Sequence, residues 1–406
     1  MATIDIHCHP GLKTWLFNSN FETDHPTLSK DFLPTDMVVD YPKMVQGEVD
    51  VILSSVYLPE SSLIKEVDPS KFVKELLNLL FNVDKKAENN SSPNQPFEQT
   101  LEFINHFENK IELAQQKNCN VCIARNFTEM ENLLEEKKKV ILHSIEGAHS
   151  LGRAIDGNTP DYFDNINKLF NRGVCLITLA HFYENDIVAP VIGMPPSVIK
   201  KLKLSGERDS SLGLTPVGEE VVKHMLDIGM IIDLTHCTRK ARDKVFEINN
   251  NRGAKKRPLV FTHVGFWGIF DHPMNPDKEE INKIKDCNGT VGIIFYNYYL
   301  MGKEEDDPLT PIIDFNPEPG IKYIFDTIDK IHNITGTYDN ISIGSDLDGF
   351  TDPPDDLYNL ARFKFLKEKL IEKYEPDDVG KILGDNMLRV LRSGWGNNNQ
   401  QEVKTI

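Results

Sequence analysis

Side chains able to bind metal stand at or just after the ends of several short apolar runs in this 406-residue sequence. Apolar runs of this length are typical of buried strands. Potential ligands at the carboxyl ends of successive parallel strands are how a (β/α)8 barrel builds a metal site. The pattern therefore favours a metal-dependent hydrolase on such a barrel. The runs are Asp5-Ile6-His7-Cys8-His9, Ser144-Ile145-Glu146-Gly147, Asp233-Leu234-Thr235-His236, Phe261-Thr262-His263 and Ile341-Ser342-Ile343-Gly344-Ser345-Asp346.

Eight Val- and Ile-rich runs are the expected strands. Near-continuous apolar runs are typical of strands covered on both faces, and helical patterns between them favour βα units. The predicted fold class is therefore α/β, a (β/α)8 TIM barrel. A long insertion, 59–125, is expected after the second strand, and a long loop, 183–212, after the fourth. The strands are expected at 3–8, 49–57, 139–145, 173–180, 229–235, 258–262, 290–296 and 340–345.

The domain organisation follows from the same pattern. Residues 1–395 are predicted to form a single barrel domain, and the polar segment 396–406 a disordered tail. The insertion is expected to contain a polar loop around 86–99, and the loop 183–212 is expected to cover substrate, because loops after barrel strands overhang the active face. Helices are expected at 126–136, 217–228, 278–287, 321–332 and 357–373, with a last helix from 376 to 391.

The net charge of −17 argues against nucleic acid or an anionic membrane as a partner, since both require a basic surface. Six scattered cysteines are expected to be mostly reduced and buried; a zinc or redox role for the Cys119–Cys122 pair is a minor alternative. No secretory signal, membrane span or lipid-anchor pattern is apparent, so a cytoplasmic location without a membrane anchor is expected.

The candidate ligands form two pairs around one acid. His7 and His9 are two residues apart, so their imidazoles point to the same side of a strand and can hold one metal. Glu146 can bridge two metals, and His236 and His263 follow neighbouring strands and suit a second metal. Each residue alone also fits a plainer role, a packed histidine or a helix cap; the placement of all of them at one end of a predicted barrel favours a metal site.

Two further side chains are candidates for catalysis. Asp346 ends the last strand, where it could bind metal or act as a general base. His181, after the fourth strand, could donate a hydrogen bond to a developing oxyanion or be structural. Asp348 is better explained as a turn residue.

The order and spacing of these segments resemble the membrane dipeptidase (renal dipeptidase) family of binuclear zinc metallopeptidases, within the amidohydrolase-like barrel superfamily. The likeness runs over nearly the whole chain. Besides the runs given above, it rests on Ala148-His149-Ser150, Leu179-Ala180-His181, Gly213-Leu214-Thr215-Pro216, Phe295-Tyr296-Asn297-Tyr298-Tyr299, Leu347-Asp348-Gly349 and Gly384-Asp385-Asn386.

The resemblance implies two Zn2+ ions bridged by Glu146. His7 and His9 would complete one site, and His236 and His263 the other. A metal-bridging hydroxide would attack the scissile amide of a dipeptide-like substrate, Asp346 would move its proton, and His181 would stabilise the tetrahedral intermediate. His181, Tyr296 and Asn297 are the expected substrate contacts. Mn2+, Co2+ or Fe2+ are alternatives to zinc, and a homodimer is an alternative suggested only by related barrels.

Two positions depart from the family pattern. The family has aspartate where this chain has His9, which removes one negative charge and would make the bound water more acidic and less nucleophilic. The family also uses an arginine after the last histidine ligand to hold the substrate's carboxylate. Here the stretch 270–275 contains Met274 and no arginine, and none occurs between Arg257 and Arg362.

These departures leave other functions open. His272 or Lys278 could replace the missing arginine as a point charge. Otherwise the substrate would be a non-dipeptide amide, an N-acyl compound or a lactone. A non-catalytic metal-binding barrel is the remaining alternative.

Overall fold

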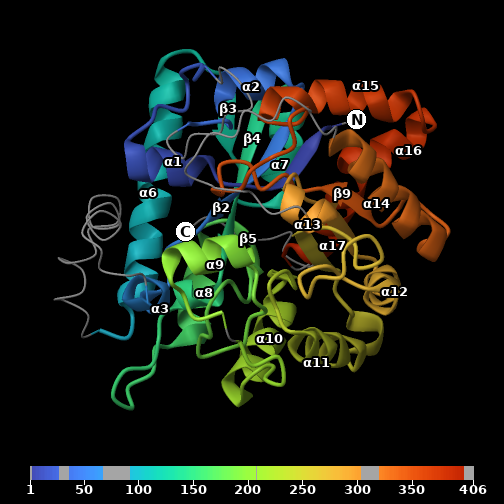
Figure 1. Cartoon of the computed structure of the whole chain (residues 1–406). Coiled ribbons are helices and arrows are strands. Elements are labelled where there is room, and N and C mark those ends of the chain that lie inside the picture. The colour runs from blue at the N-terminus through green and yellow to red at the C-terminus, as the bar shows by residue number, and fades with distance from the viewer. Residues whose placement is uncertain (1, 27–35, 67–91, 207, 303–319, 397–406) are drawn as a thin grey trace.

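One parallel sheet forms the centre of the molecule. The computed structural model describes residues 2–26, 36–66, 92–206, 208–302 and 320–396 (Figure 1). Helices surround the sheet on its outer side. The strands are β1 (Ile4–Cys8), β2 (Val51–Val56), β3 (Val121–Ile123), β4 (Lys139–Glu146), β5 (Val174–Thr178), β6 (Ile231–Asp233), β7 (Leu259–Val264), β8 (Thr290–Ile293) and β9 (Ile341–Ile343).

Eight of these strands follow the order β1-β2-β4-β5-β6-β7-β8-β9, each parallel to its neighbours. The last strand returns to the first just beyond its end: the amide of Asp346 donates to the carbonyl of His7 at 2.9 Å, and the amide of His9 donates to that of Leu347 at 2.8 Å. The sheet is thus a nearly closed eight-stranded barrel, and the predicted α/β TIM-barrel fold and its eight strands are confirmed.

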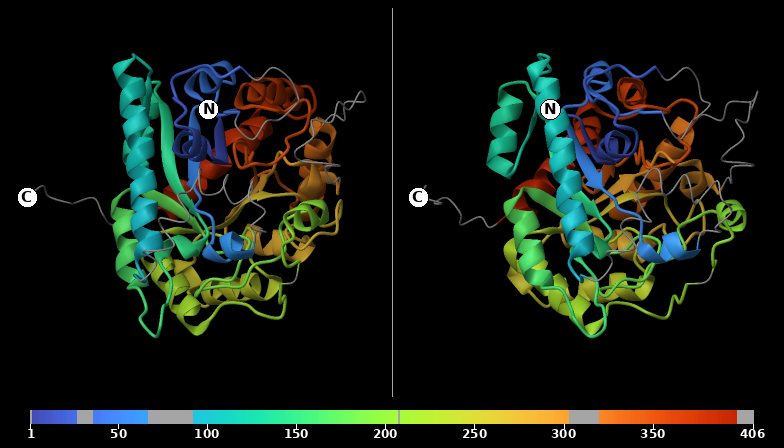
Figure 2. Two further views of the ribbon diagram at one scale, coloured as in Figure 1. Left: turned by 60° about the vertical axis from the view of Figure 1, so that its left-hand side comes forward. Right: turned by 90° about the vertical axis from the view of Figure 1, so that its left-hand side faces the viewer.

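The insertion after β2 lies outside the barrel. Its described part contains α3 (Ser61–Glu66) and the long helix α6 (Gln95–Gln116), which runs along one side of the molecule in Figure 2. It also contains β3, which pairs with the first half of β4 while β5 pairs with the second half. The sequence did not predict this ninth strand. The polar loop predicted at 86–99 is wrong at its end, because residues 95–99 belong to α6; residues 86–91 lie outside the described part.

Most predicted helices are present near their expected bounds: α7 (Phe127–Glu135), α10 (Pro216–Ile228), α12 (Lys278–Asp286) and α14 (Gly320–Thr335). The side chains of Asn126, Thr215 and Asp277 cap α7, α10 and α12. The helix predicted at 357–373 begins later than expected, because Asn359 is extended and only a short 3-10 turn, Leu360–Arg362, precedes α15 (Phe363–Ile371). The remaining helices are α1 (Pro10–Phe17), α2 (Tyr41–Gln46), α8 (Tyr162–Asn171), α9 (Pro196–Leu202), α11 (Arg239–Asn250), α13 (Asn297–Met301), α16 (Pro376–Gly380) and α17 (Asn386–Gly394), the last two joined by a π-helical turn, Lys381–Asp385.

Apolar side chains on both faces of the strands form the core. The larger cluster joins strand residues such as Ile141 and Ile145 to the outer helices, including Phe103 and Phe107 of α6. The other joins alternate strand residues such as Leu142 to α17. This two-sided burial explains the near-continuous apolar strands of the sequence.

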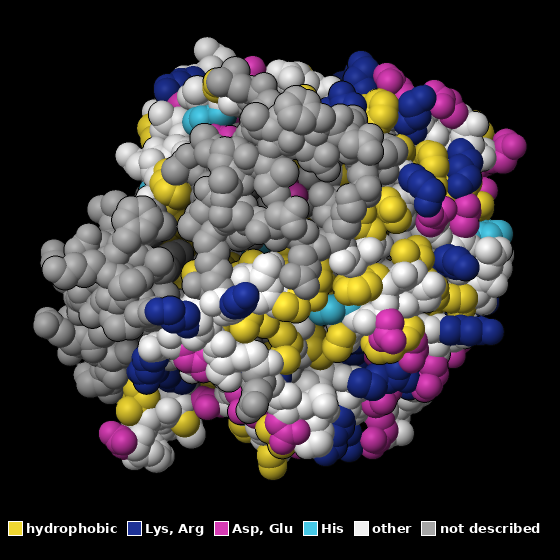
Figure 3. Space-filling view, viewed as in Figure 1, with side chains coloured by type: hydrophobic (Ala, Val, Ile, Leu, Met, Phe, Trp, Pro, Cys, Tyr) yellow, Lys and Arg dark blue, Asp and Glu magenta, His cyan; other side chains and the backbone are white. Residues whose placement is uncertain are grey.

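Charges of both signs are interspersed on the outer helices, as Figure 3 shows for one face. This mixture is typical of a solvated surface and does not form a basic patch on that face. No helix in the described part of the chain is both long and apolar enough to cross a membrane. The division into a domain of residues 1–395 and a tail of 396–406 stays a prediction, since residues 397–406 lie outside the described part.

Candidate metal centre

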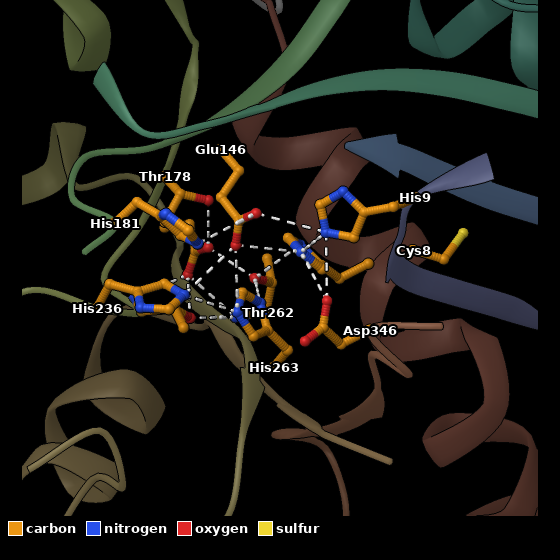
Figure 4. A network of polar contacts seen from close by, with 12 residues as sticks. Cys8, His9, Glu146, Thr178, His181, His236, Thr262, His263 and Asp346 are labelled. Carbon is orange, nitrogen blue, oxygen red and sulfur yellow. Dashed lines mark hydrogen bonds and ion pairs between the residues drawn. The ribbon is translucent and has the colours of Figure 1, made fainter. Parts of the chain in front are cut away.

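Seven polar side chains converge at the carboxyl ends of the barrel strands, in the network that Figure 4 shows. His7 and His263 lie within β1 and β7, and Glu146 is the last residue of β4. The others follow strand ends. Two of them have left-handed backbones, with φ of 66° at His236 and 60° at Asp346. A left-handed backbone is unfavourable for residues other than glycine, and such positions cluster at functional sites.

On the β1 side of the centre, two imidazoles point at the same two carboxylates. The Nε2 atoms of His7 and His9 lie 3.1 Å apart. Each lies 3.4 Å from an oxygen of Glu146. The Asp346 Oδ1 atom lies 3.2 Å from His9 Nε2 and 3.8 Å from His7 Nε2. The same strand carries Cys8, whose sulfur points away from this group (Figure 4).

On the β6–β7 side, His236 and His263 are arranged in the same way. Their Nε2 atoms are 3.1 Å apart and lie 3.4 and 3.3 Å from Glu146 Oε1. Because the same oxygen also faces His7, Glu146 touches both pairs of histidines. The carboxylate is therefore placed as a bridge between two halves of one centre.

A second layer of hydrogen bonds fixes which nitrogen of two histidines carries the proton. The buried Asp233 carboxylate only accepts, so the Thr262 hydroxyl donates to it, at 2.6 Å. Thr262 Oγ1 is then an acceptor for the Nδ1 atoms of His263 at 2.9 Å and His7 at 3.3 Å. In the neutral form of either ring, Nε2 is then left with a lone pair that faces Glu146. Such outer bonds are typical of metal-binding histidines.

Burial and charge act in opposite directions on these groups. Burial alone would raise the pKa of Glu146, but His181, His7 and His236 lower it well below its usual value. Burial also lowers the pKa of His263 well below the usual value and lowers that of His236. At His7, burial alone would lower the pKa, but Glu146, with smaller contributions from Asp346 and Asp233, raises it to about 9. The centre therefore combines an ionised bridging carboxylate, neutral imidazoles and a position that attracts positive charge.

The donor set fits divalent metal ions. Within each histidine pair the Nε2 atoms lie 3.1 Å apart, and a cation bound between them would be held by a lone pair of each nitrogen. In a tetrahedral zinc site with Zn–N bonds of 2.0–2.1 Å, ligand atoms lie about 3.3 Å apart, close to the separations seen here. Three overlapping groups could hold a metal: His7, His9 and Asp346; His7, Glu146 and His263; and Glu146, His181 and His236. These clusters are consistent with a binuclear site, and the assignment of each residue to one metal stays a prediction.

His181 and a residue that the sequence did not single out, Glu60, form a pair beside this centre. His181 Nε2 lies 3.8 Å from Glu146 Oε2, and its Nδ1 lies 3.0 Å from Glu60 Oε1. Glu60 is only 4% exposed. It follows β2 in the segment Leu58-Pro59-Glu60, before α3, with no motif to mark it, so only the tertiary contact identifies it.

The other predicted substrate residues lie after β8. Tyr296 is buried and packs against Tyr298 and Tyr299, whereas Asn297 begins α13 with its Nδ2 atom 3.5 Å from an oxygen of Asp352. Their contact with substrate stays a prediction. Asp348 lies in a turn, which agrees with the turn role expected for it. Its carboxylate also accepts bonds from the backbone amides of residues 38 and 39, both at 2.9 Å.

Three side chains of the stretch that lacks the expected arginine, His272, Met274 and Asn275, are buried. Burial lowers the pKa of His272 to about 4, which argues against a point charge there near neutral pH; its role in place of the arginine stays a prediction. Met274 is fully buried, and its carbonyl accepts a bond from Arg242 at 3.2 Å. Arg242 is itself buried and paired with Glu280 at 3.4 Å, so it is not available as a clamp. Lys278 is exposed at the start of α12.

Three comparisons with known proteins agree with this geometry. The family model "Membrane dipeptidase (Peptidase family M19)" matches residues 1–403. An uncharacterised dipeptidase of Schizosaccharomyces pombe is 26% identical over 250 residues, 61% of this chain and 52% of that protein. This chain thus aligns with about half the length of that relative. Dipeptidase tcpJ of Claviceps purpurea is 23% identical over 362 residues, 87% of this chain and 75% of that protein.

Solved structures share the fold. A metallopeptidase from Rhodobacter sphaeroides, liganded with a phosphinate mimic of the dipeptide L-Ala-D-Ala, superposes with a TM-score of 0.70 at 18% identity, covering 97% of this chain and 99% of that one. The probable dipeptidase PvdM from Pseudomonas aeruginosa gives 0.69 at 18% identity, covering 97% and 96%.

Proposed function

Because the chain belongs to the membrane dipeptidase family of metallopeptidases, we propose that it is a zinc-dependent hydrolase that cleaves the amide bond of dipeptides or closely related small substrates. The observation that carries this proposal is the convergence of four histidine Nε2 atoms on the two oxygens of Glu146. A cytoplasmic location and a homodimer stay predictions.

Glu146, the two histidine pairs and Asp346 would hold the metals. Bound divalent ions of this kind supply Lewis-acid polarisation of a carbonyl and lower the pKa of water. His, Glu and Asp ligands suit zinc, and they also suit manganese, cobalt or iron. His9, where the family has an aspartate, is a good zinc ligand. The Asp346 Oδ1 atom, 3.2 Å from His9 Nε2, provides a carboxylate on the same side of the centre.

The chain's own residues then have distinct tasks. Asp346 would accept the proton of the attacking water at Oδ2, since Oδ1 faces His7 and His9, and return it to the leaving amine, a general base and then a general acid. His181 would donate from Nε2 to the carbonyl oxygen as negative charge develops there, which is worth most in a buried site. Both side chains are at most 10% exposed, so little solvent competes for these bonds.

The missing arginine supports a second candidate within the same chemistry. No free cation has been identified in the stretch 270–275, and His272 is neutral near pH 7. A substrate without a free carboxylate, such as an N-acyl compound, an amide or a lactone, would need none. A non-catalytic barrel is less well supported, because the ligand cluster is complete and its backbone is held in unfavourable conformations at His236 and Asp346.

The test is a panel of L-L and L-D dipeptides with their C-terminally amidated and esterified counterparts, offered to zinc-reconstituted protein. Asp346→Asn serves as the blank, because it keeps the shape but loses the base. Turnover of free dipeptides that disappears in the variant supports the dipeptidase proposal. Turnover of only the blocked compounds favours the second candidate. No turnover of either, in protein that holds two metals, contradicts both.

A further inference from the structure

The Glu60 carboxylate connects the segment between β2 and α3 to the imidazole of His181. We propose that Glu60 is a positioning residue: it fixes the ring of His181 so that Nε2 faces the oxygen of the scissile carbonyl. This inference rests on the proposed function, because it assigns Glu60 a task in that reaction. The two residues are 121 positions apart in the sequence.

Three donors hold the Glu60 carboxylate in place. Its Oε1 atom accepts bonds from His181 Nδ1 at 3.0 Å and from the amide of Phe182 at 2.8 Å. Its Oε2 atom accepts a bond from the hydroxyl of Tyr57 at 2.8 Å. Because both oxygens are bonded and the group is almost fully buried, the carboxylate has one orientation, and it passes that orientation to His181.

The bond to Nδ1 decides how the imidazole can act. An ionised carboxylate is an acceptor only, so Nδ1 of His181 must carry a proton toward Glu60. Turning the ring over would break this bond and point a carbon atom at the carboxylate. Nε2 is thereby kept on the other side of the ring, 3.8 Å from Glu146 Oε2, in the metal centre.

Aromatic packing restricts the same ring from its faces. The ring centroid of His181 lies 4.4 Å from that of Tyr57, 3.7 Å from that of Phe182 and 4.6 Å from that of His236. Packing limits the tilt of the ring, but it does not distinguish Nδ1 from a carbon atom. Among the hydrogen bonds of the described residues, the one to Glu60 does so, which is why we assign the positioning task to Glu60.

A purely structural ion pair would affect stability alone, whereas a positioning residue affects the transition state more than substrate binding. Removing the acceptor should therefore lower kcat and leave KM nearly unchanged. Outer-shell partners of active-site histidines typically contribute 10–100-fold. We expect a loss of about 30- to 100-fold in kcat with less than about a 3-fold change in KM.

The test compares two variants of nearly the same shape, Glu60→Gln and Glu60→Met. Glutamine keeps an oxygen that can accept from Nδ1, whereas methionine is similar in length and flexibility but offers only a weak thioether acceptor. Tyr57→Phe is the control, because it removes one bond to the carboxylate but leaves the Glu60–His181 bond intact. Metal content per chain and melting temperature are measured for all of them.

Two readouts are needed. The first is kcat and KM on whichever substrate the wild type hydrolyses. The second is the nitrogen-15 NMR signal of the His181 Nδ1–H in histidine-labelled zinc protein, assigned by its loss in His181→Gln. We expect Glu60→Gln to keep the signal and lose less than about 10-fold in kcat, and Glu60→Met to lose the signal and most of kcat while both keep two metals.

The inference is overturned if the Nδ1–H signal persists in Glu60→Met, or if that variant turns over like the wild type. Equal losses in Glu60→Gln, Glu60→Met and Tyr57→Phe would also overturn it, because they would indicate a structural role. If the wild type hydrolyses nothing in the panel, the proposed function fails by itself. The NMR comparison, which needs no substrate, then still decides whether Glu60 orients His181.

Discussion

Strand β4 carries two buried clusters of ionisable side chains, and the two are built in opposite ways. Glu146, at its end, faces five imidazole nitrogens and no arginine or lysine in the described contacts. His143, three residues earlier and so on the other face, meets Glu108 of α6 at 3.3 Å. Glu108 also binds Arg125 at 2.9 Å and Arg172 at 2.7 Å.

This difference indicates that the two clusters have different roles. In the Glu108 cluster, opposite charges are already paired, so it needs no further ion and holds α6 against the barrel. In the Glu146 cluster, imidazole nitrogens converge on one carboxylate with no arginine or lysine among the described contacts, and a bound metal cation would be held by the lone pairs of these nitrogens. Buried charge alone therefore does not identify a functional site; unbalanced donor atoms that converge on one point do.

The largest effect is expected from Glu146→Ala. Because Glu146 touches both histidine pairs, its loss should empty both halves of the centre and lower kcat/KM by about 10³-fold or more, since metal catalysis supplies several kcal/mol. Metal content by mass spectrometry and turnover are the measurements, with the exposed Glu131→Ala as a matched control. Unchanged metal content in Glu146→Ala would contradict the assignment of Glu146 as a metal ligand.

Metal removal provides a second way to compare the clusters. A chelator should lower the melting temperature of the wild type, because a ligand bound only to the native state stabilises it by about 2.7 kcal/mol at a concentration 100 times its Kd. It should leave Glu146→Ala unaffected. An equal shift in both proteins would place the metal elsewhere.

Single histidine variants should divide the centre into halves. His9→Ala removes a donor on the β1 side and His236→Ala one on the β6–β7 side, so each should lose about one metal and keep the other. Activity should fall by about 10²-fold or more in both. Loss of both metals from either variant would show that the two halves do not bind independently.

The convergence of these side chains could be predicted from the sequence because strand ends are visible in it. Apolar runs that end at Glu146 or His263 indicate both the strand and its exit, and parallel strands place all such exits at one end of a barrel. Glu60 lies in the segment after β2, and its partner His181 is 121 residues away, so no local sequence pattern reveals this contact. The three-residue strand β3 was missed for a similar reason: only its pairing with β4 distinguishes it from a loop.

Substrate recognition could be predicted only in part. The lack of an arginine in 270–275 is visible in the sequence, but the neutral state of His272 depends on its burial in the folded chain. Asp233 also ends an apolar run, as the candidate ligands do, and its role could not be predicted from that run. The pairing of β6 with β7 places its carboxylate against the Thr262 hydroxyl, outside the candidate ligand groups.

Asp233→Asn should have an intermediate effect. The Asp233 carboxylate accepts bonds from the hydroxyls of Thr178, Thr235 and Thr262. In asparagine an NH2 group replaces one of the two oxygens, so the side chain would donate hydrogen bonds at a position where the carboxylate accepts them. Thr262 would then orient His7 and His263 less well, and metal affinity should fall by about 10–100-fold. Competition with a chromogenic chelator measures it. Thr178→Ser, which keeps its hydroxyl, should change affinity by less than about 3-fold, and equal losses in both variants would point to general damage.

The smallest effect on activity is expected in the other cluster. Glu108→Gln should lower the free energy of unfolding by about 2 kcal/mol at pH 7, less than for a fully buried pair because Arg125 and Arg172 are partly exposed. It should change kcat by less than about 2-fold, since no bond reaches the metal centre. Urea unfolding and turnover measure the two effects. Glu131→Gln, whose partner Arg392 is 67% exposed, should lose less than about 0.5 kcal/mol.

The pH dependence of that loss sharpens the comparison. Burial alone would raise the pKa of Glu108, but bonds from His143, Arg125 and Arg172 lower it below its usual value of 4.5. A carboxyl group with a lowered pKa in the folded state adds stability above its unfolded pKa and loses it as the pH falls toward the folded one. The difference between wild type and Glu108→Gln should thus be constant from pH 6 to 8 and shrink below about pH 4.5. A difference that grows on acidification would mean that Glu108 is not the ionised partner of these cations.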